Sequence, residues 1–345
     1  MATLVTGATG YIGRRVALRL VRQGQRLRVL CRDAGWLDPE IKNSPLVEVM
    51  LGDLGDTDIV RRACADMSGI IHLAAGTGGS AEEFDRSTLG GTTNLLEAAE
   101  AAGVSRIVYV SSMSVYDYSS MKAGSLVDEN APLESHPEKR DNYARSKRVA
   151  EDIVARHVAR GKLSISVVRP GIVYGPNNRS PFVPVTALRR LPMVGFLLVG
   201  GGRRQVPLIY VENLVDALLL LLECEGCGGR IYNVIDNDPR SERDYLATLE
   251  RTTGVPLKIQ SVPVVTFLPL MVALEVLRRA RRKKGMNVVH GLLRVTKNIR
   301  FDAGRLQREL GWRSRVGLEE ALRESFGTPA PAAAAPRAVQ PFRAV

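Results

Sequence analysis

A tyrosine and a lysine stand four residues apart in the segment "DNYARSK", which runs from Asp141 to Lys147. On a helix, residues at this spacing lie one above the other on the same face. A free phenol has a pKa of about 10, and a neighbouring ammonium lowers it, which makes a tyrosine such as Tyr143 a better proton donor and acceptor at neutral pH. Ordinary solvated helices also carry this spacing, so the rest of the sequence must decide between the two interpretations.

A glycine-rich segment near the N-terminus, "TGATGYIG", is the second feature with chemical meaning. It follows an apolar strand and opens a helix, and its glycines are Gly7, Gly10 and Gly13. The first glycine permits a tight turn, the second lets the backbone approach a pyrophosphate, and the third permits close packing of helix and strand. The N–H groups at the start of the helix are donors for phosphate. This segment predicts a dinucleotide cofactor.

Residues after the following strands would complete the cofactor site. The second strand ends "VLCRD", where an arginine favours a ribose 2′-phosphate and an acid favours a free 2′-hydroxyl. Arg32 therefore favours NADP, which we expect in preference to NAD, and the adjacent Asp33 keeps NAD open. Asp53, in "GDLGD" after the third strand, is predicted to accept a hydrogen bond from the adenine amino group. Ala74 and Ala75 end the segment "HLAA", where small side chains let a cofactor pass close to the backbone.

The elements that must position these residues are short apolar runs alternating with amphipathic helical segments. Nearly continuous apolar strands in such an alternation indicate a parallel sheet covered on both faces. We therefore expect an α/β fold, a Rossmann-type doubly wound parallel sheet with a smaller, mostly helical C-terminal substrate region. The expected strands are "TLVTG", "LRVLCR", "VEVMLGD", "GIIHLAA", "RIVYVSS" and "ISVVRPG".

The regular alternation ends at about residue 175. Residues 1–175 are predicted to form the NAD(P)-binding domain, to which residues 206–235 return with the helix-like "VENLVDALLLLLE" and the strand-like "RIYNVI". Residues 176–205 and 236–327 are predicted to form the substrate-binding region. Residues 328–345 are rich in Ala and Pro and are predicted to be a disordered tail.

The formal net charge of the 345-residue chain is +12. It contains no segment typical of a nucleic-acid-binding module, so we predict no nucleic-acid partner. A phosphate-rich cofactor, an anionic substrate or a membrane surface would each fit this charge. Residues 262–285 join an apolar segment to the basic run "RRARRKKG". The apolar part is too short for a membrane span, and it suits either a peripheral membrane contact or a helix that lines the substrate pocket.

The remaining residue patterns indicate no metal site. Cys224 and Cys227 form a single C-x-x-C pair without a second pair of ligands, which predicts a loop after a helix rather than zinc binding. His72 ends a predicted strand and is expected to be a core residue. The chain enters its first strand without a signal-peptide pattern, so we predict a cytoplasmic protein, with peripheral membrane attachment left open.

Taken together, these segments resemble the extended short-chain dehydrogenase/reductases of the NAD-dependent epimerase/dehydratase superfamily. They occur in the family's order from residue 3 to about 176, and weaker similarity continues to about 326. The late apolar segment is similar to one in the 3β-hydroxysteroid dehydrogenase-like branch. The matching segments are "TGATGYIG", "GDL", "HLAA", "YVSSMSVY", "YARSK" and "VRPGIVYGP".

The resemblance implies a role for each matching residue. Tyr143 resembles the general acid/base, and Lys147 resembles the residue that binds the nicotinamide ribose and lowers the pKa of the phenol. Ser112 matches the hydroxyl that binds the reacting oxygen, whereas Ser111 would point to the other face of the strand. The segment "VRPGIVYGP" matches the nicotinamide side of the pocket. The expected cofactor-binding residues are Gly7, Thr9, Gly10, Tyr11, Ile12, Gly13, Arg32, Asp53, Leu54, Leu73, Ala74, Ala75, Tyr143, Lys147, Pro170, Ile172 and Val173.

Three positions depart from the family's patterns. Met113 and Ser114 stand where the 4,6-dehydratases of nucleotide sugars carry an Asp-Glu pair, so the elimination of water would lack its acid and base. Thr88 replaces an asparagine ahead of the fourth helix, which affects local cofactor contacts. The stretch "LLRVTKNIRFD" lacks the Arg-Pro-Gly-Asp segment of many sugar-nucleotide epimerases, which weakens the epimerase interpretation.

The resemblance thus implies an NAD(P)-dependent oxidoreductase that transfers hydride between nicotinamide and a secondary alcohol or ketone through Ser112, Tyr143 and Lys147. The alternative is a nucleotide-sugar epimerase that uses the same three residues without net cofactor turnover. A cofactor-binding sensor or assembly subunit is a third interpretation, which the presence of both Tyr143 and Lys147 disfavours. The substrate is expected to be a small molecule, hydrophobic or nucleotide-linked, and a homodimer stays open.

Overall fold

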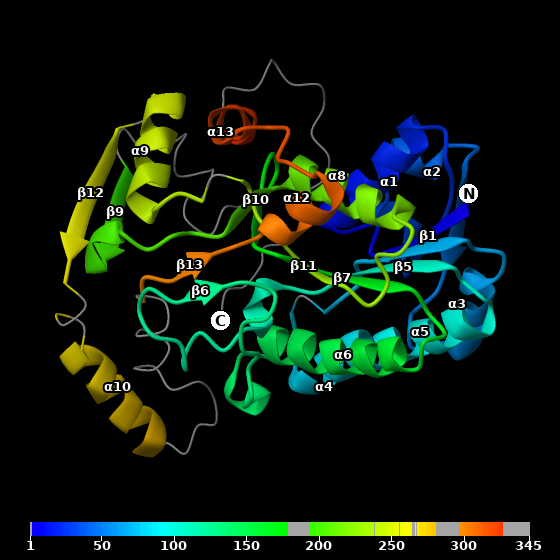
Figure 1. The fold of residues 1–345 in the computed structure, drawn as a ribbon, viewed down its shortest axis with the longest axis horizontal. Coiled ribbons are helices and arrows are strands. Elements are labelled where there is room, and N and C mark those ends of the chain that lie inside the picture. Colours follow the sequence, from blue (N-terminus) through cyan, green and yellow to red (C-terminus); the bar gives the residue numbers. More distant parts are fainter. Residues whose placement is uncertain are drawn as a thin grey trace.

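The computed structural model describes residues 2–76, 78–178, 194–237, 239–254, 256–263, 266, 268–280 and 297–326. The predicted tail (328–345), part of the predicted substrate region and the end of the 262–285 segment lie outside these residues. Seven parallel strands form the main sheet, in the order β11-β7-β5-β4-β1-β2-β3 (Figure 1). These strands are β1 (Ala2–Thr6), β2 (Arg26–Cys31), β3 (Val47–Leu51), β4 (Gly69–His72), β5 (Arg106–Val110), β7 (Ile165–Pro170) and β11 (Ile231–Val234).

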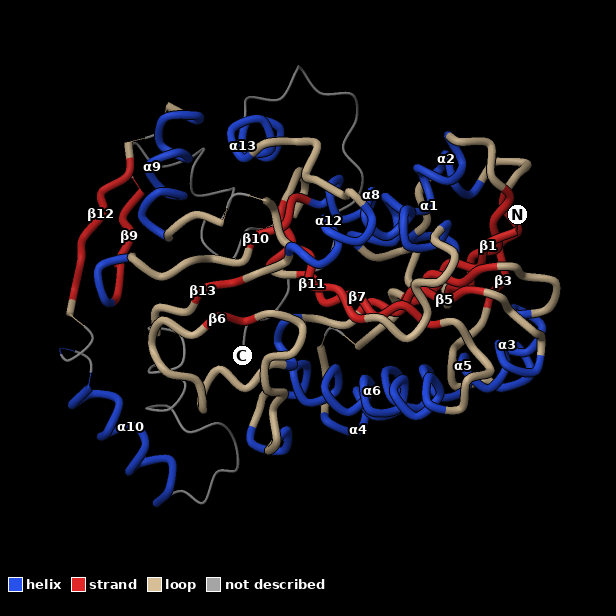
Figure 2. The backbone as a smooth tube through the Cα atoms, viewed as in Figure 1, coloured by secondary structure: helices blue, strands red, loops and turns tan. Residues whose placement is uncertain are grey.

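Helices cover both faces of this sheet, and the predicted doubly wound Rossmann-type fold is confirmed (Figures 1 and 2). The helices α1 and α8 lie on one face, and α3, α5 and α6 lie on the other. Their bounds, with the short α2 and α4 and the π-helical η2, are α1 (Tyr11–Arg22), α2 (Pro39–Lys42), α3 (Thr57–Cys64), α4 (Ala81–Phe84), η2 (Asp85–Gly90), α5 (Gly91–Ala101), α6 (Asn142–Ala159) and α8 (Val211–Glu223).

Alternation along the strands explains why both faces carry helices. Val5 and Ile71 belong to the core on the α1 and α8 side, whereas their neighbours Leu4 and Ile70 belong to the core on the α3, α5 and α6 side. All four side chains are fully buried. Burying one such side chain stabilises the fold by roughly 1.5–3 kcal/mol. A strand that is apolar on both faces therefore needs a helix layer on each side, as the sequence indicates.

The strand order reverses between β1 and β4, because β2 and β3 follow β1 on one side and β4 begins the other side. In open α/β sheets, ligands bind in the crevice at the carboxyl ends of the strands at such a switch point. The glycine-rich segment after β1, the "HLAA" segment after β4 and Ser112 after β5 all lie at this edge.

Outside the main sheet, the described residues form small parallel strand pairs with helices beside them, here called the smaller region, and some of these strands lie within the range predicted to be the NAD(P)-binding domain. In the described residues, β8 pairs with β10, β9 with β12 and β6 with β13. The elements are β6 (Leu126–Val127), β8 (Ile172–Tyr174), β9 (Val194–Val199), β10 (Leu208–Tyr210), β12 (Leu257–Val262), β13 (Arg300–Phe301), α9 (Glu242–Thr253), α10 (Leu268–Ala280), α12 (Gly304–Leu310) and α13 (Leu318–Phe326). Nowhere in the described ranges does a helix combine the length and apolar character needed to cross a membrane.

Candidate active site

The glycine-rich turn between β1 and α1 is held by direct backbone contact. Gly7 has a φ of +78°, and a Cβ there would lie 2.8 Å from the amide nitrogen of Ala74. A Cβ on Gly13 would lie 2.1 Å from the carbonyl oxygen of Gly7, so helix and turn touch at this point. Gly10 caps α1 and supplies no side-chain acceptor to its first turn, and that turn holds no acidic residue. The amides at the start of α1 are therefore suited to a phosphate group.

The turn after β2 brings Arg32 and Asp33 to the surface. The Asp33 carboxylate accepts a hydrogen bond from the amide of Gly35, at 2.7 Å, and caps the short 3-10 helix η1 (Ala34–Trp36). The carboxylate is thus engaged in its own turn, whereas Arg32 is exposed. Both residues lie where the sequence placed the adenosine end of a dinucleotide.

The loop after β3 is tied to α5 by a contact that sequence reasoning missed. The Asn94 side chain donates to the carbonyl oxygen of Leu54, at 2.8 Å. Asp53 is exposed and its carboxylate accepts from the amide of Gly55, also at 2.8 Å. Asn94 lies in the first half of α5, and nothing in its spacing in the sequence indicated this role.

His72 is a buried core residue, as the sequence predicted. One ring nitrogen lies 2.7 Å from the hydroxyl oxygen of Thr6, and the other lies 3.1 Å from that of Thr92. Burial, with a smaller effect from the positive charge of Lys147, lowers the pKa of His72 to about 3. The ring is therefore neutral at pH 7. Its two contacts connect the end of β4 to β1 and α5, directly before Leu73, Ala74 and Ala75 in the chain.

Two neighbouring serines after β5 point to different partners. The Ser112 side chain lies near enough to Tyr143 to act on the pKa of the phenol, and the Ser112 hydroxyl accepts from the amide of Ser114, at 3.1 Å. The Ser111 hydroxyl instead donates to the carboxylate of Glu151, at 2.6 Å. The structure thus brings Ser112, and not Ser111, to the phenol, because consecutive side chains of an extended backbone point in opposite directions.

The helix α6 places Tyr143 and Lys147 at the same edge of the sheet. Its first turn is capped by Asp141, whose carboxylate accepts from the amide of Ala144, at 2.9 Å. Tyr143 is 37% exposed and Lys147 only 3%. The ammonium of Lys147 donates to the carbonyl oxygen of Val110, at 2.8 Å, one residue before the serine pair. Tyrosine, lysine and serine side chains from α6 and β5 therefore converge at the carboxyl end of β5.

The electrostatics of this group are set mainly by desolvation. It raises the pKa of Tyr143, the opposite of the lowering that the sequence led us to expect from Lys147, and the interaction with Ser112 acts in the other direction. Desolvation lowers the pKa of Lys147 to about 8, and the negative charge of Glu151 opposes that change. At pH 7 most Lys147 side chains therefore carry a charge, at a place where few water molecules can screen it.

A buried network beneath the site was not predicted from the sequence. Arg169 is 1% exposed, and its guanidinium forms an ion pair with Glu151, which lies one turn after Lys147 on α6. Arg169 also donates to the hydroxyl of Tyr116, at 2.9 Å, and to the carbonyl oxygen of Glu129, at 3.2 Å. The only sequence signals were the spacing of Glu151 from Lys147 and the place of Arg169 inside "VRPGIVYGP".

Three further residues, which the resemblance assigned to the nicotinamide side of the pocket, form a wall at the end of β7. Pro170 ends β7 and is buried, and the half-buried Ile172 and Val173 belong to β8, which pairs with β10. A Cβ on Gly171 would lie 2.1 Å from the carbonyl oxygen of Pro207, so β7 and the approach to β10 are in close contact. This wall therefore joins the main sheet to the smaller region.

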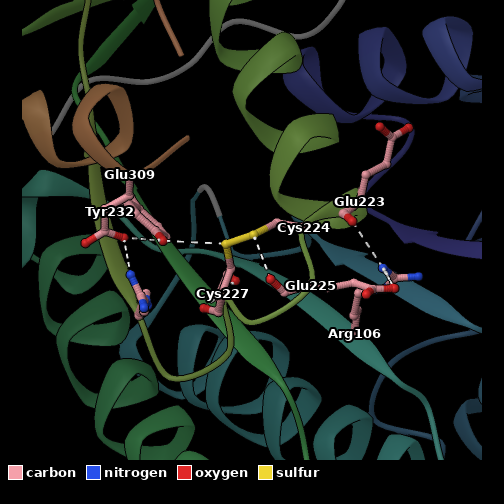
Figure 3. The surroundings of a disulfide bond; sticks show 9 residues. Arg106, Glu223, Cys224, Glu225, Cys227, Tyr232 and Glu309 are labelled. Carbon is pink, nitrogen blue, oxygen red and sulfur yellow. Dashed lines mark hydrogen bonds and ion pairs between the residues drawn. A yellow bond between two sulfur atoms is a disulfide. The ribbon is translucent and has the colours of Figure 1, made fainter. Parts of the chain in front are cut away.

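The Cys224–Cys227 pair forms a disulfide in the loop between α8 and β11, which the sequence analysis did not predict (Figure 3). Beside it, the Tyr232 hydroxyl lies 3.6 Å from the sulfur of Cys227 and donates to Glu309, at 2.9 Å. The Arg106 side chain, at the start of β5, donates to the carbonyl oxygen of Glu223, at 3.1 Å. The disulfide thus lies at the opposite end of β5 from Ser112. No cluster of three potential metal ligands occurs among the described residues.

The sequence is similar to one known family and to two reductases over most of its length. Residues 3–234 match the model of the NAD dependent epimerase/dehydratase family. The chain is 30% identical over 332 residues to the 4-hydroxy-2-methyl-3-oxo-4-farnesyl-3,4-dihydroquinoline-1-oxide ketoreductase of Stigmatella aurantiaca, covering 93% of this chain and 95% of the relative. It is 26% identical over 333 residues to the 2-alkyl-3-oxoalkanoate reductase of Stenotrophomonas maltophilia (strain K279a), covering 94% and 98%.

Solved structures share the fold over nearly the whole length of the chain. The crystal structure of gox2253 superposes with a TM-score of 0.77 at 25% identity and covers 94% of this chain and 96% of that one. The structure of MoeE5 in complex with UDP-glucuronic acid and NAD has a TM-score of 0.70 at 23% identity and covers 94% and 98%. The structural similarity thus includes the C-terminal region as well as the Rossmann-type sheet, in proteins of similar length.

Proposed function

The chain belongs to the NAD-dependent epimerase/dehydratase family, and from this premise we propose that it is an NAD(P)-dependent reductase of a ketone in a molecule with a long apolar chain. The observation that carries the proposal is the meeting of Ser112, Tyr143 and Lys147 at the carboxyl end of β5, beside the glycine-rich turn. In this family's oxidoreductases, residues of these types bind the substrate oxygen and transfer the proton, and the cofactor transfers the hydride.

The residues around the switch point fit a nicotinamide dinucleotide. The uncapped amides of α1 suit a pyrophosphate, and the close contact of Gly7 with Ala74 leaves bare backbone on two neighbouring strands. Asp53 and Arg32 would contact the adenosine end, and Lys147 would hold the nicotinamide ribose. When bound, the cofactor supplies hydride to a carbonyl carbon or accepts it from an alcohol carbon.

The chain's own residues would then manage the substrate oxygen and one proton. Ser112 would donate a hydrogen bond to the carbonyl oxygen, and Tyr143 would give its phenolic proton to that oxygen as the carbon is reduced. The charged Lys147 would stabilise the phenolate left on Tyr143, which a proton from water then restores. The same steps in reverse oxidise a secondary alcohol. The partial exposure of Tyr143 leaves the phenol open to a substrate.

The substrate class is proposed from the relatives. Both are named as ketone reductases, and both names describe a substrate with a farnesyl or alkyl chain. They cover this chain almost entirely, so the likeness includes the smaller region that would hold the substrate. A 2-alkyl-3-oxo acid, or a ring ketone with a prenyl chain, is therefore the first substrate to test.

A nucleotide-sugar epimerase is the second candidate, and one pocket favours it. Arg203 and Arg243, both exposed, line an open surface pocket of about 670 Å³ in the smaller region, with Gly201, Ser261 and Pro263. Two guanidinium groups suit the diphosphate of a nucleotide sugar. An epimerase oxidises and re-reduces one carbon, so it consumes no NAD(P)H overall.

The balance of cofactor separates the two functions. The purified protein should oxidise NADPH or NADH in a one-to-one ratio with reduction of a long-chain 2-alkyl-3-oxo acid. It should leave UDP-glucose and UDP-glucuronic acid unchanged, as read by chromatography of the sugar nucleotides. Conversion of a nucleotide sugar without net NAD(P)H oxidation, together with no oxidation in the presence of the ketone, would overturn the reductase in favour of the epimerase.

A further inference from the structure

The helix α10 has its apolar residues on the outside and its acidic residue on the inside. Leu270, Val272, Leu274, Val276 and Leu277 are 56%, 47%, 44%, 60% and 50% exposed. These five, hereafter the α10 apolar surface, are the majority of the large hydrophobic side chains that the described residues expose. Glu275 is 6% exposed and has a partner within the protein. A helix that packs against the protein core shows the opposite arrangement, with its apolar side chains buried and its charged side chains exposed.

The α10 apolar surface covers most of the circumference of the helix. At 100° per residue, positions 270, 274 and 277 lie on one side of the axis and positions 272 and 276 on the other. Helices that are apolar on nearly all sides are covered by a protein core or by lipid. In Figure 1, α10 stands at the lower left, away from the main sheet and at the end of the molecule opposite the N-terminus. The core of this protein therefore does not cover it.

The charge of the same segment indicates what kind of partner covers the α10 apolar surface. The sequence from position 278 to position 284 reads "RRARRKK", with six cations in seven positions. Between Glu250 and Asp302 the sequence has a single acidic residue, Glu275, which is buried. Apolar side chains next to a dense run of lysine and arginine bind a negatively charged lipid surface, where the apolar groups enter the interface and the cations pair with headgroups.

We propose that α10 docks this protein on an anionic lipid bilayer by inserting the α10 apolar surface into the interface. A second copy of the chain is a poorer occupant, because it would bring another run of positive charge without an exposed acid on α10 to match it. No helix in the described part of the chain can span the bilayer, so attachment is peripheral and reversible. This proposal is independent of the reductase assignment, because it uses none of the residues of the catalytic group.

The test is vesicle co-sedimentation of the purified full-length chain. Wild type should bind vesicles of phosphatidylglycerol and phosphatidylcholine, bind pure phosphatidylcholine much less, and lose binding in high salt. Replacement of Leu270, Val276 and Leu277 by serine should weaken binding roughly tenfold or more. The matched control is Leu126→Ser, which alters a leucine of similar exposure, 48%, on β6, and it should bind like wild type.

Folding and self-association are measured on the same samples. Far-ultraviolet circular dichroism and the Tm of the triple variant should match wild type, because its three residues are exposed. Failure of wild type to bind anionic vesicles, or equal binding by the folded triple variant, would overturn the proposal. It would also be overturned if light scattering showed a dimer that the triple variant converts to a monomer, since a second copy would then cover α10.

Discussion

Replacing Glu151 with glutamine removes the negative charge from the buried network beneath the proposed catalytic group. Glu151 pairs with the guanidinium of Arg169, accepts from the hydroxyl of Ser111 at 2.6 Å, and opposes the lowering of the pKa of Lys147. The Glu151→Gln variant keeps the size of the side chain but leaves Arg169, which is 1% exposed, as a buried charge without a counter-charge.

The expected loss of stability follows from this burial. Removing one partner of a buried ion pair costs about 3–5 kcal/mol, mostly because the remaining charge is uncompensated. Arg169 keeps two neutral acceptors, the hydroxyl of Tyr116 and the carbonyl oxygen of Glu129. We therefore expect the lower end, about 3 kcal/mol, in the free energy of unfolding. The double variant Glu151→Gln/Arg169→Met should recover at least half of it, because no buried charge is left.

Urea unfolding at pH 7 measures these free energies, with the slope m as a check that the unfolded state is unchanged. The pH profile of kcat gives a second readout. Without the charge of Glu151, the pKa of Lys147 falls further, so the alkaline limb of the profile should move to lower pH. A loss of less than about 1 kcal/mol, which is typical of an exposed pair, would refute the reasoning. So would a double variant less stable than Glu151→Gln.

Other predictions concern the cofactor site and the buried histidine. In Gly13→Ala, the added Cβ would lie 2.1 Å from the carbonyl oxygen of Gly7. The affinity for NADPH, measured by calorimetry, should therefore fall at least tenfold. The control Gly317→Ala, where an added Cβ has no atom within 4 Å, should leave this affinity unchanged. Because the pKa of His72 is about 3 in the folded state and about 6.5 in the unfolded state, the unfolded chain binds more protons between these values. Stability should therefore fall as the pH drops from 6.5 to 3, and His72→Gln should flatten that part of a urea-unfolding series; an unchanged slope would contradict it. Arg32→Ala should reduce the affinity for NADPH more than that for NADH, and equal losses would exclude a contact with the 2′-phosphate.

Local signals in the sequence were sufficient for the sheet, whereas the roles proposed for Ser112, Tyr143 and Lys147 came from the resemblance to a family. The glycine spacing predicted the β1–α1 turn, because steric contact of backbone with backbone leaves no room for a side chain at Gly13. The resemblance selected Ser112, and the alternation of an extended strand predicted that Ser111 would point to the other face. The glycine turn and the strand alternation each depend on residues close together in the chain.

Contacts between distant segments could not be predicted in the same way. The pairing of Glu151 with Arg169, and the bond from Asn94 to the Leu54 carbonyl, depend on how α6, β7 and α5 pack, and many charged or amide residues have equivalent local sequences. The exposure of the apolar residues of α10 and the burial of Glu275 depend on which side of the helix packs against the protein. An apolar segment alone suits a pocket-lining helix equally well.

The proton role of Tyr143 is the central claim, and one comparison tests it most directly. In Tyr143→Phe, the ring that packs beside Ser112 remains and the exchangeable proton is lost. We predict that kcat for ketone reduction falls by roughly 10²–10⁴, the usual contribution of general acid–base catalysis, while the Kd for NADPH stays within about twofold of wild type. Turnover near the wild-type rate by a variant that still binds NADPH would contradict the account.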